Sequence, residues 1–164
     1  MIQSTIEQAR EFAIAAHAGQ RYGGNPYSYH LDAVVEILKN YGHDAQVIGY
    51  LHDVVEDTDV VLGDIRSHFG DDVAEAVSLL TDEPGEDRET RKQRTNAKLS
   101  RSSNSLALIV KVADRLTNIR ESQKDPTTGK LSMYRLEHEA FRAAAYRAGL
   151  CDTLWLEMDQ ILRL

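Results

Sequence analysis

Four ionisable side chains crowd into one short segment, residues 49–58, between apolar neighbours. They are His52, Asp53, Glu56 and Asp57. In a helix with 3.6 residues per turn, His52 would stand over Glu56, and Asp53 over Asp57. Such a half-buried charged edge costs stability unless something compensates it. Imidazole and carboxylate groups are ligands for a hydrolytic metal ion, and further carboxylates can handle water. The alternative is a polar helix edge that faces solvent.

Two residues elsewhere in the chain offer ligand atoms of the same kind. His30 stands near the expected start of a helix, and Asp114 lies in the segment 106–122, which is apolar on most of its surface. A buried aspartate needs a partner such as an arginine, a helix cap or a metal ion. With His52 and Asp53, these residues would form a mixed nitrogen and oxygen set that suits Mn²⁺ or Fe²⁺ better than structural zinc. Spacing alone does not bring the helices together.

The elements that must position these residues are all expected to be helices, because apolar residues recur at helical spacing along the chain. Ser4, with Glu7 three residues later, is the expected N-cap of the first helix. The expected helices are 5–18, 30–41, a third that is capped by Asp44 and holds the charged segment, 62–69, a fifth that is capped by Asp71 or Asp72 and reaches residue 80, and then 106–122, 131–148 and 151–164. No segment alternates with period two for long enough to predict a strand. We therefore predict an all-α single domain over residues 1–164.

Composition narrows the class of protein. The chain has 164 residues, 42% of them hydrophobic and 27% charged, which is typical of one soluble domain. A single cysteine, Cys151, excludes an intramolecular disulfide and a cysteine-rich zinc site. A net charge of −7 argues against nucleic acid as a partner. Neither a signal segment nor a membrane-spanning run is apparent, so we expect a cytoplasmic protein with no membrane partner.

Several ordered sequence blocks carry a family resemblance that covers nearly the whole chain. The blocks are Ala16-His-Ala-Gly-Gln20, Asn25-Pro-Tyr-Ser-Tyr-His30, His52-Asp-Val-Val-Glu-Asp-Thr58 and Val112-Ala-Asp-Arg-Leu-Thr-Asn118. They resemble the HD superfamily of metal-dependent phosphohydrolases, and more closely the hydrolase domain of Rel/SpoT proteins and the free-standing small alarmone hydrolases. The resemblance implies an HD-domain helical bundle of about eight or nine helices.

The resemblance also implies a metal site and a reaction. One divalent ion, usually Mn²⁺ with Fe²⁺ or Co²⁺ as alternatives, would be held by His30, His52, Asp53 and Asp114. The substrate would be (p)ppGpp, and the cleaved group its 3′-pyrophosphate. Glu56 and Asp57 lie one turn beyond the ligands, where we expect them to orient or deprotonate the attacking water.

A polyanionic nucleotide approaching an acidic protein needs a local positive field. Arg21 and the 88–92 region are candidates, and the alternative for the basic run 88–101 is a solvated helix face. Arg88 matches a phosphate-contacting lysine of the resembling family, and arginine grips phosphate well. Asn118, one turn beyond Asp114, matches a residue that reads ribose or phosphate. Arg135 matches a further phosphate-contacting arginine.

Two departures from the family pattern lie near the loop expected to read the base. The loop between His17 and Pro26 is one residue shorter than usual, and Leu31 replaces a common proline. The adenine alarmone (p)ppApp therefore stays open as a substrate, as does a phosphatase reaction on the 2′-phosphate of NADPH. A non-catalytic nucleotide-binding module is a further alternative. The sequence leaves the oligomeric state undetermined.

Overall fold

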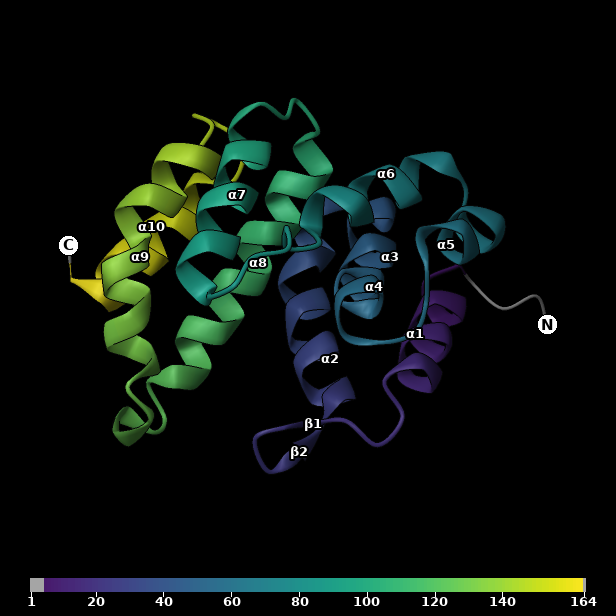
Figure 1. Ribbon diagram of the computed structural model, residues 1–164, viewed down its shortest axis with the longest axis horizontal. Helices are drawn as coiled ribbons and strands as arrows, with labels where there is room; N and C mark the ends of the chain where they lie inside the picture. The colour runs from purple at the N-terminus through teal and green to yellow at the C-terminus, as the bar shows by residue number, and fades with distance from the viewer. Residues whose placement is uncertain (1–4, 164) are drawn as a thin grey trace. The chain divides into compact units, whose positions relative to one another are not determined.

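The computed structural model describes residues 5–163, which are predominantly helical (Figure 1). The chain divides into two compact units between Asp82 and Glu83. The first unit contains α1 (Thr5–Ala16), β1 (Arg21–Tyr22), β2 (Asn25–Pro26), α2 (Tyr27–Leu38), the 3₁₀ turn η1 (Lys39–Tyr41), α3 (His43–Leu51), α4 (Val54–Asp57), α5 (Leu62–Phe69) and α6 (Asp71–Leu80). The second contains α7 (Arg88–Ser100), α8 (Ser105–Ser122), the 3₁₀ turn η2 (Pro126–Thr128), α9 (Lys130–Ala145) and α10 (Asp152–Leu162).

The predicted all-α class is confirmed for the described residues. The expected number of helices, about eight or nine, also agrees if the single turn α4 is counted as the end of α3. That one domain spans residues 1–164 stays a prediction, and the proposed N-cap Ser4 lies outside the described residues. None of the helices in residues 5–163 is both long and apolar enough to cross a membrane.

Three local expectations were wrong: the helix cap at Asp44, the helix cap at Asp71 or Asp72, and the absence of strands. The helix α3 begins at His43, and its N-cap is Gly42. The N-cap of α6 is Gly70, at φ 92°, and Asp71 is the first helical residue, with its carboxylate 2.7 Å from Arg66 Nε. The loop after α1 contains a short antiparallel ladder, in which Arg21 pairs with Pro26 and Tyr22 with Asn25. Strands of two residues are too short to produce a visible alternation of side chains, so period two could not predict them.

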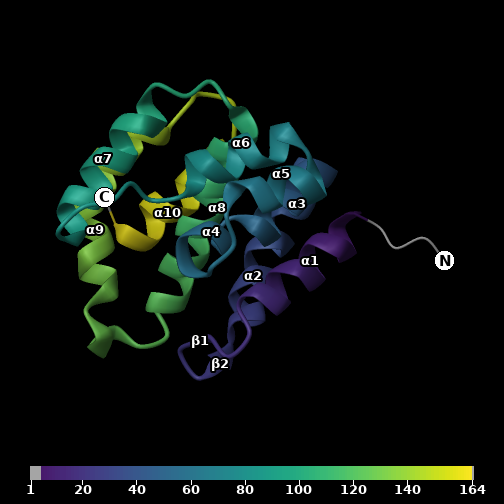
Figure 2. The same cartoon turned by 45° about the vertical axis from the view of Figure 1, so that its right-hand side comes forward.

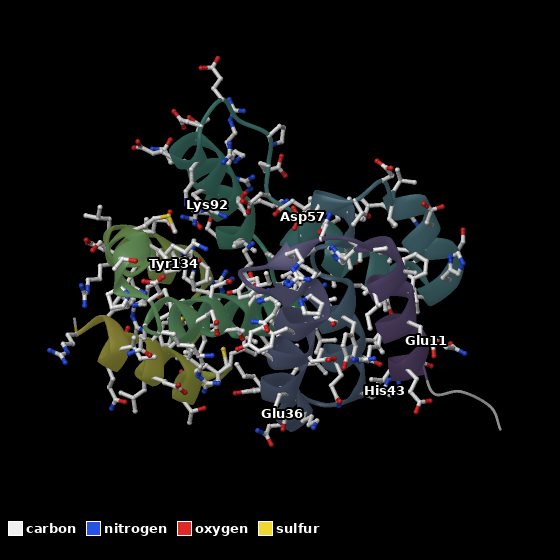
Figure 3. The ribbon with its side chains drawn as sticks, turned by 90° about the horizontal axis from the view of Figure 1, so that it is seen from below. Glu11, Glu36, His43, Asp57, Lys92 and Tyr134 are labelled. Atoms are coloured by element: carbon white, nitrogen blue, oxygen red, sulfur yellow. The ribbon has the colours of Figure 1, made fainter. Side chains whose placement is uncertain are left out.

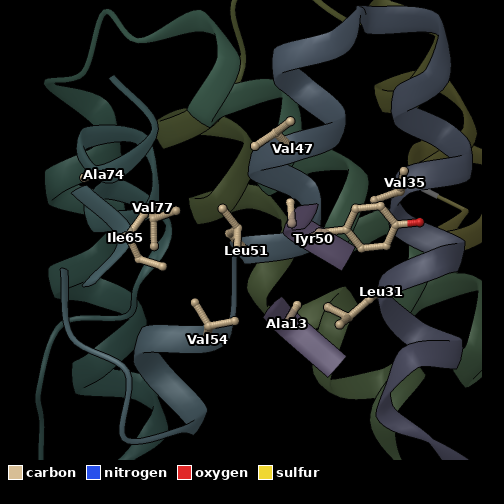
Figure 4. Packing of buried hydrophobic residues seen from close by; sticks show 11 residues of the cluster. Ala13, Leu31, Val35, Val47, Tyr50, Leu51, Val54, Ile65, Ala74 and Val77 are labelled. Atoms are coloured by element: carbon tan, nitrogen blue, oxygen red, sulfur yellow. The ribbon is translucent and has the colours of Figure 1, made fainter. Parts of the chain in front are cut away.

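The apolar core of the first unit lies around α3 (Figure 4). Leu51 and Val54 are fully buried there with residues from α1, α2, α5 and α6, including Ala13, Leu31, Ile65 and Val77. Gly49 allows α2 to approach α3 closely, because a Cβ at this position would lie 2.5 Å from Leu38 Cδ1. The close packing of α2 on α3 positions His30, on α2, relative to His52, at the end of α3.

In the second unit, α9 packs against α7 and α8, and α10 packs against α8 and α9 (Figure 2). Phe141 and Trp155 lie fully buried with their ring centroids 5.2 Å apart. The guanidinium of Arg115 sits over the Phe141 ring at 4.6 Å from its centroid. Cys151 is the N-cap of α10, and burial raises the pKa of its thiol to about 11.

Candidate metal centre

The helix expected to carry the charged cluster is interrupted at His52 and Asp53, two of the four residues predicted to bind metal. The helix α3 ends at Leu51, and Asp53, at φ −106° and ψ −3°, separates it from the single turn α4. The expectation of one continuous helix through His52 and Glu56 was therefore wrong. The relation between Asp53 and Asp57 holds, because Asp57 N donates to Asp53 O at 3.0 Å.

The imidazole of His52 is oriented by the end of its own helix. The Nδ1–H group donates to Gly49 O at 2.6 Å, and the side chain is buried, so the carbonyl is satisfied by the ring. With the proton on Nδ1, the lone pair of a neutral ring lies on Nε2. That atom is 3.0 Å from Asp53 Oδ2. Two lone-pair atoms at this distance repel unless a proton or a cation compensates them.

His30 brings a second imidazole to the same carboxylate. The predicted start of α2 near His30 is too late by one turn: α2 begins at Tyr27, and His30 is buried within its first turn. Its Nε2 lies 3.8 Å from Asp53 Oδ2, and its ring centroid is 5.6 Å from that of His52. The face of the His30 ring stacks on Tyr22, with centroids 4.6 Å apart and planes at 17°. Packing therefore fixes the plane of the ring.

Glu56 and Asp57 extend the carboxylate cluster toward solvent. One oxygen from each of Asp53, Glu56 and Asp57 lies within 4.8 Å of the others. Glu56 is held from one side, because its Oε1 accepts from Asp82 N at 2.6 Å. Asp57 is labelled in Figure 3, and its Oδ2 is 3.4 Å from Tyr27 Oη. Partial desolvation, together with the charge of Asp53, raises the pKa of Asp57, although His17 and the Tyr27 hydroxyl oppose the rise.

The donor set of the first unit fits a divalent cation. Two imidazole nitrogens and a carboxylate oxygen converge on one point, and their side chains are buried or partly buried. This mixture of nitrogen and oxygen ligands is suited to Mn²⁺, Fe²⁺ or another first-row metal. A His/Asp cluster able to hold a divalent metal ion is therefore present, while the identity of the ion is a separate question.

In the second unit, Asp114 lies on α8 and is partly buried, less deeply than the sequence suggested. As expected from the spacing of one turn, Asn118 shares its face: Asn118 Nδ2 donates to Asp114 Oδ1 at 3.0 Å. Burial raises the pKa of Tyr134 (labelled in Figure 3), and the negative charge of Asp114 contributes a smaller rise. The roles of Asp114 as a ligand and of Asn118 as a substrate contact stay predictions.

The predicted phosphate contact Arg88 is the first residue of α7 and faces α9. Its Nε donates to Glu137 Oε1 at 2.6 Å, while Arg115 Nη1 donates to Glu137 Oε2, also at 2.6 Å. Burial acts to raise the pKa of Glu137, but the two arginines outweigh it and hold the pKa below its usual range.

A pocket of about 480 Å³ opens beside this cluster. Arg88, Lys92 and Arg115 form its cationic part, and Met133 and Leu136 contribute apolar walls. Its size suits a small-molecule ligand or a part of one.

The two remaining predicted contacts are held by backbone carbonyls. Arg21, exposed on β1, donates to Gly24 O across its hairpin. Arg135 Nε donates to Leu162 O at the end of α10, at 3.3 Å, whereas its neighbours Leu136 and Glu137 line the pocket with Arg88. The structure thus groups Arg88 with Arg115, and it does not group Arg135 with them.

Comparison with known proteins identifies the family. The family model for the HD domain matches residues 9–151. The chain belongs to the HD domain family. Residues 9–151 include the charged segment after α3 as well as Asp114 on α8, so the family match spans both units.

Within the HD family, the relatives include both long and short proteins. A probable guanosine-3′,5′-bis(diphosphate) 3′-pyrophosphohydrolase of Synechocystis is 33% identical over 152 residues, covering 88% of this chain and 20% of that protein. The mouse pyrophosphohydrolase MESH1 is 33% identical over 153 residues, covering 89% of this chain and 84% of the mouse protein. The chain spans about a fifth of the length of the first three curated relatives that it matches.

A solved structure has a similar fold over nearly all of this chain. It is described as a metazoan ortholog of SpoT that hydrolyses ppGpp and plays a role in starvation responses. Its TM-score is 0.86 at 27% identity, with 99% of this chain and 96% of that chain covered. The fold inferred from the sequence blocks is thereby confirmed.

Sequence reasoning missed three residues that contact predicted site residues. Tyr27 and Gln20 contact the charged cluster, and Glu137 binds two arginines. Tyr27 and Gln20 lie inside the sequence blocks that carried the family resemblance, which was the available signal. Glu137 lies in an ordinary amphipathic helix, and no local pattern singled it out.

Proposed function

We propose that the chain is a metal-dependent 3′-pyrophosphohydrolase of alarmone nucleotides, (p)ppGpp or its adenine analogue (p)ppApp, that releases pyrophosphate. The observation that carries the proposal is the convergence of His30 Nε2 and His52 Nε2 on Asp53 Oδ2, with two further carboxylates beside it. The activity by which several relatives are named, among them MESH1 of mouse, supports the choice of substrate.

In this proposal the resident ion is Mn²⁺, with Fe²⁺ or Co²⁺ as alternatives, and Asp114 joins His30, His52 and Asp53 as the fourth ligand. The ion would supply a Lewis acid that lowers the pKa of water and neutralises charge on a phosphoryl oxygen. His52 and His30 bind through Nε2, because Gly49 O orients the first ring and Tyr22 orients the second. Neutral imidazoles and ionised carboxylates are the forms that bind metal.

Glu56 and Asp57 take the proton-handling role. The hydrogen bond from Asp82 N to Oε1 fixes the Glu56 carboxylate, which would direct a water molecule. Asp57 has a pKa raised by partial desolvation and by Asp53, which makes its carboxylate a stronger base than an ordinary aspartate. These carboxylates favour turnover over binding alone, because a binding module does not require groups that activate water.

The substrate contacts proposed are Arg21, Arg88, Asn118 and Arg135. Support is strongest for Arg88, which opens onto a pocket of about 480 Å³ with Lys92 and Arg115. A phosphate group would compete there with Glu137 for the Arg88 guanidinium. Phosphate and carboxylate oxygens can each accept hydrogen bonds from the same two N–H groups. Arg135 is supported only by its position in the sequence.

A product assay tests this function. The purified chain is incubated with Mn²⁺ and, in separate reactions, ppGpp, ppApp and NADPH, and products are resolved by anion-exchange chromatography. The proposal expects pyrophosphate together with GDP or ADP. If orthophosphate is released from NADPH and neither alarmone is cleaved, the chain is a nucleotide phosphatase. If ppGpp binds and stays unchanged, the chain is a nucleotide-binding module.

A further inference from the structure

The hydroxyl group of Tyr27 contacts the oxygen of Asp53 that faces the two imidazoles. Tyr27 Oη donates to Asp53 Oδ2 at 2.6 Å. The same Oδ2 is the atom that lies 3.0 Å from His52 Nε2 and 3.8 Å from His30 Nε2. A hydrogen bond at this distance to a carboxylate is short and charge-assisted, and it restricts rotation of the carboxylate about its terminal bond.

The same hydroxyl also reaches the water-handling side of the cluster. Its oxygen is 3.4 Å from Asp57 Oδ2, so it lies between the carboxylates of Asp53 and Asp57. Two carboxylates in one site repel each other, which is one cause of the raised pKa of Asp57. A donor placed between them offsets this repulsion and keeps their separation fixed.

Tyr27 is itself held by a buried platform. Its ring stacks on His17, with centroids 4.3 Å apart and planes at 27°, and the His17 side chain is buried. His17 Nδ1 donates to Gln20 Oε1 at 2.8 Å, and Gln20 Nε2 donates to Asp57 O at 2.5 Å. These contacts connect the loop after α1 to both ends of the charged cluster, so that the phenol is pre-positioned by the fold.

From this geometry we infer that Tyr27 is a positioning residue of the metal centre, which turns Asp53 Oδ2 toward His30 and His52. The inference rests on the metal binding proposed above and adds the residue that orients a ligand. Partners of metal ligands orient the ligand and tune the site, and their loss costs roughly 10–100-fold in metal affinity. The role requires the hydroxyl, whereas the ring serves the stacking on His17.

Tyr27→Phe separates these two contributions, because it removes the hydroxyl and keeps the ring. Tyr50→Phe is the matched control: Tyr50 Oη donates to Asp32 Oδ1 at 2.9 Å, so that variant also loses one hydrogen bond from tyrosine to aspartate in the same unit. For both variants and the unmodified protein, the affinity for Mn²⁺ is measured by electron paramagnetic resonance of the free ion. The visible absorption of bound Co²⁺ reports the ligand geometry, and a thermal melt reports folding.

The expected result is a Kd for Mn²⁺ that rises about 10–100-fold in Tyr27→Phe, with an altered Co²⁺ spectrum and a melting temperature no lower than that of Tyr50→Phe. Tyr50→Phe should bind both ions as the unmodified protein does. An unchanged Kd and Co²⁺ spectrum in Tyr27→Phe would overturn this inference while leaving the proposed metal centre in place. Failure of the unmodified protein to bind either ion would overturn the metal centre as well.

Discussion

The Nδ1–H group of His52 donates to the carbonyl oxygen of Gly49, three residues earlier, at 2.6 Å. This contact determines which nitrogen of the His52 ring carries the lone pair, so the backbone at the end of α3 sets the atom that can bind a metal ion. The neighbouring carboxylate of Asp53 then faces Nε2, as a shared cation requires.

Asp53→Ala is expected to abolish stoichiometric metal binding, because it removes the carboxylate on which both imidazoles converge. Asp114→Ala should have the same effect if Asp114 completes the ligand set. Metal content after exposure to Mn²⁺ and gel filtration, measured by mass spectrometry, checks both variants. Full retention of Mn²⁺ in Asp114→Ala would remove that residue from the ligand set without affecting the other three.

Glu56→Gln and Asp57→Asn are expected to retain metal and lose turnover, because they remove a proton acceptor and keep the shape of the side chain. The expected fall in kcat is about 10²–10⁴-fold, the usual contribution of a general base. Steady-state kinetics with metal content measured in parallel provides the check. A normal kcat in both variants would contradict the assigned role.

Arg88→Ala is expected to raise KM by about tenfold or more with little change in kcat, since a hydrogen bond to a charged group is worth ~1.5–3 kcal/mol. Arg120→Ala is a suitable control. Arg120 also lies on a helix of the second unit and forms a two-point ion pair, with Glu157, at 2.7 Å. A rise of KM in both variants would indicate a general loss of positive charge and would argue against a specific contact at Arg88.

Gly49→Ala is expected to destabilise the protein by about 1–3 kcal/mol, the usual cost of overpacking a core. The added Cβ would meet Leu38 Cδ1 at 2.5 Å and Val35 Cγ2 at 3.1 Å. In Gly63→Ala, the control on α5, the nearest atom is Val61 Cγ2 at 4.0 Å, and helix propensity should make that variant slightly more stable. Urea unfolding of the two variants measures the change in unfolding free energy, which should be a decrease for Gly49→Ala and a small increase for Gly63→Ala.

The cluster of Glu137 with Arg88 and Arg115 makes a contribution to stability that depends on pH. Burial acts to raise the pKa of Glu137, but the two arginines lower it by more, so that the pKa in the folded protein is below the ordinary value. The stabilisation is therefore present at neutral pH and is lost as the pH falls from the ordinary glutamate pKa through the depressed one. The difference in unfolding free energy between the unmodified protein and Glu137→Gln should shrink across that acidic range. A difference that is independent of pH would contradict this assignment.

The sequence predicted the fold class and the helix 62–69 because apolar residues recur there at helical spacing. It could not predict the interruption at His52 and Asp53, since both residues keep right-handed backbone angles and neither is a helix-breaking residue type. The same limit applies to Tyr27: its residue type suggests packing, and only the fold brings its hydroxyl to Asp53.

Residues distant in sequence were harder still. The ion pairs of Glu137 join α9 to α7 and α8, and helical periodicity carries no information on such partners. The family resemblance singled out Arg88, which lines a pocket, but it gave no indication that a carboxylate already binds the guanidinium of this residue.

The buried N-cap of α10 has a practical consequence. Since Cys151 is the chain's single cysteine and its pKa of about 11 keeps the thiol protonated, maleimide reagents at neutral pH should leave the native protein unlabelled. A cysteine introduced at an exposed position such as Glu11 (labelled in Figure 3) would then accept a spin label or fluorophore at one defined site, without first removing the native thiol.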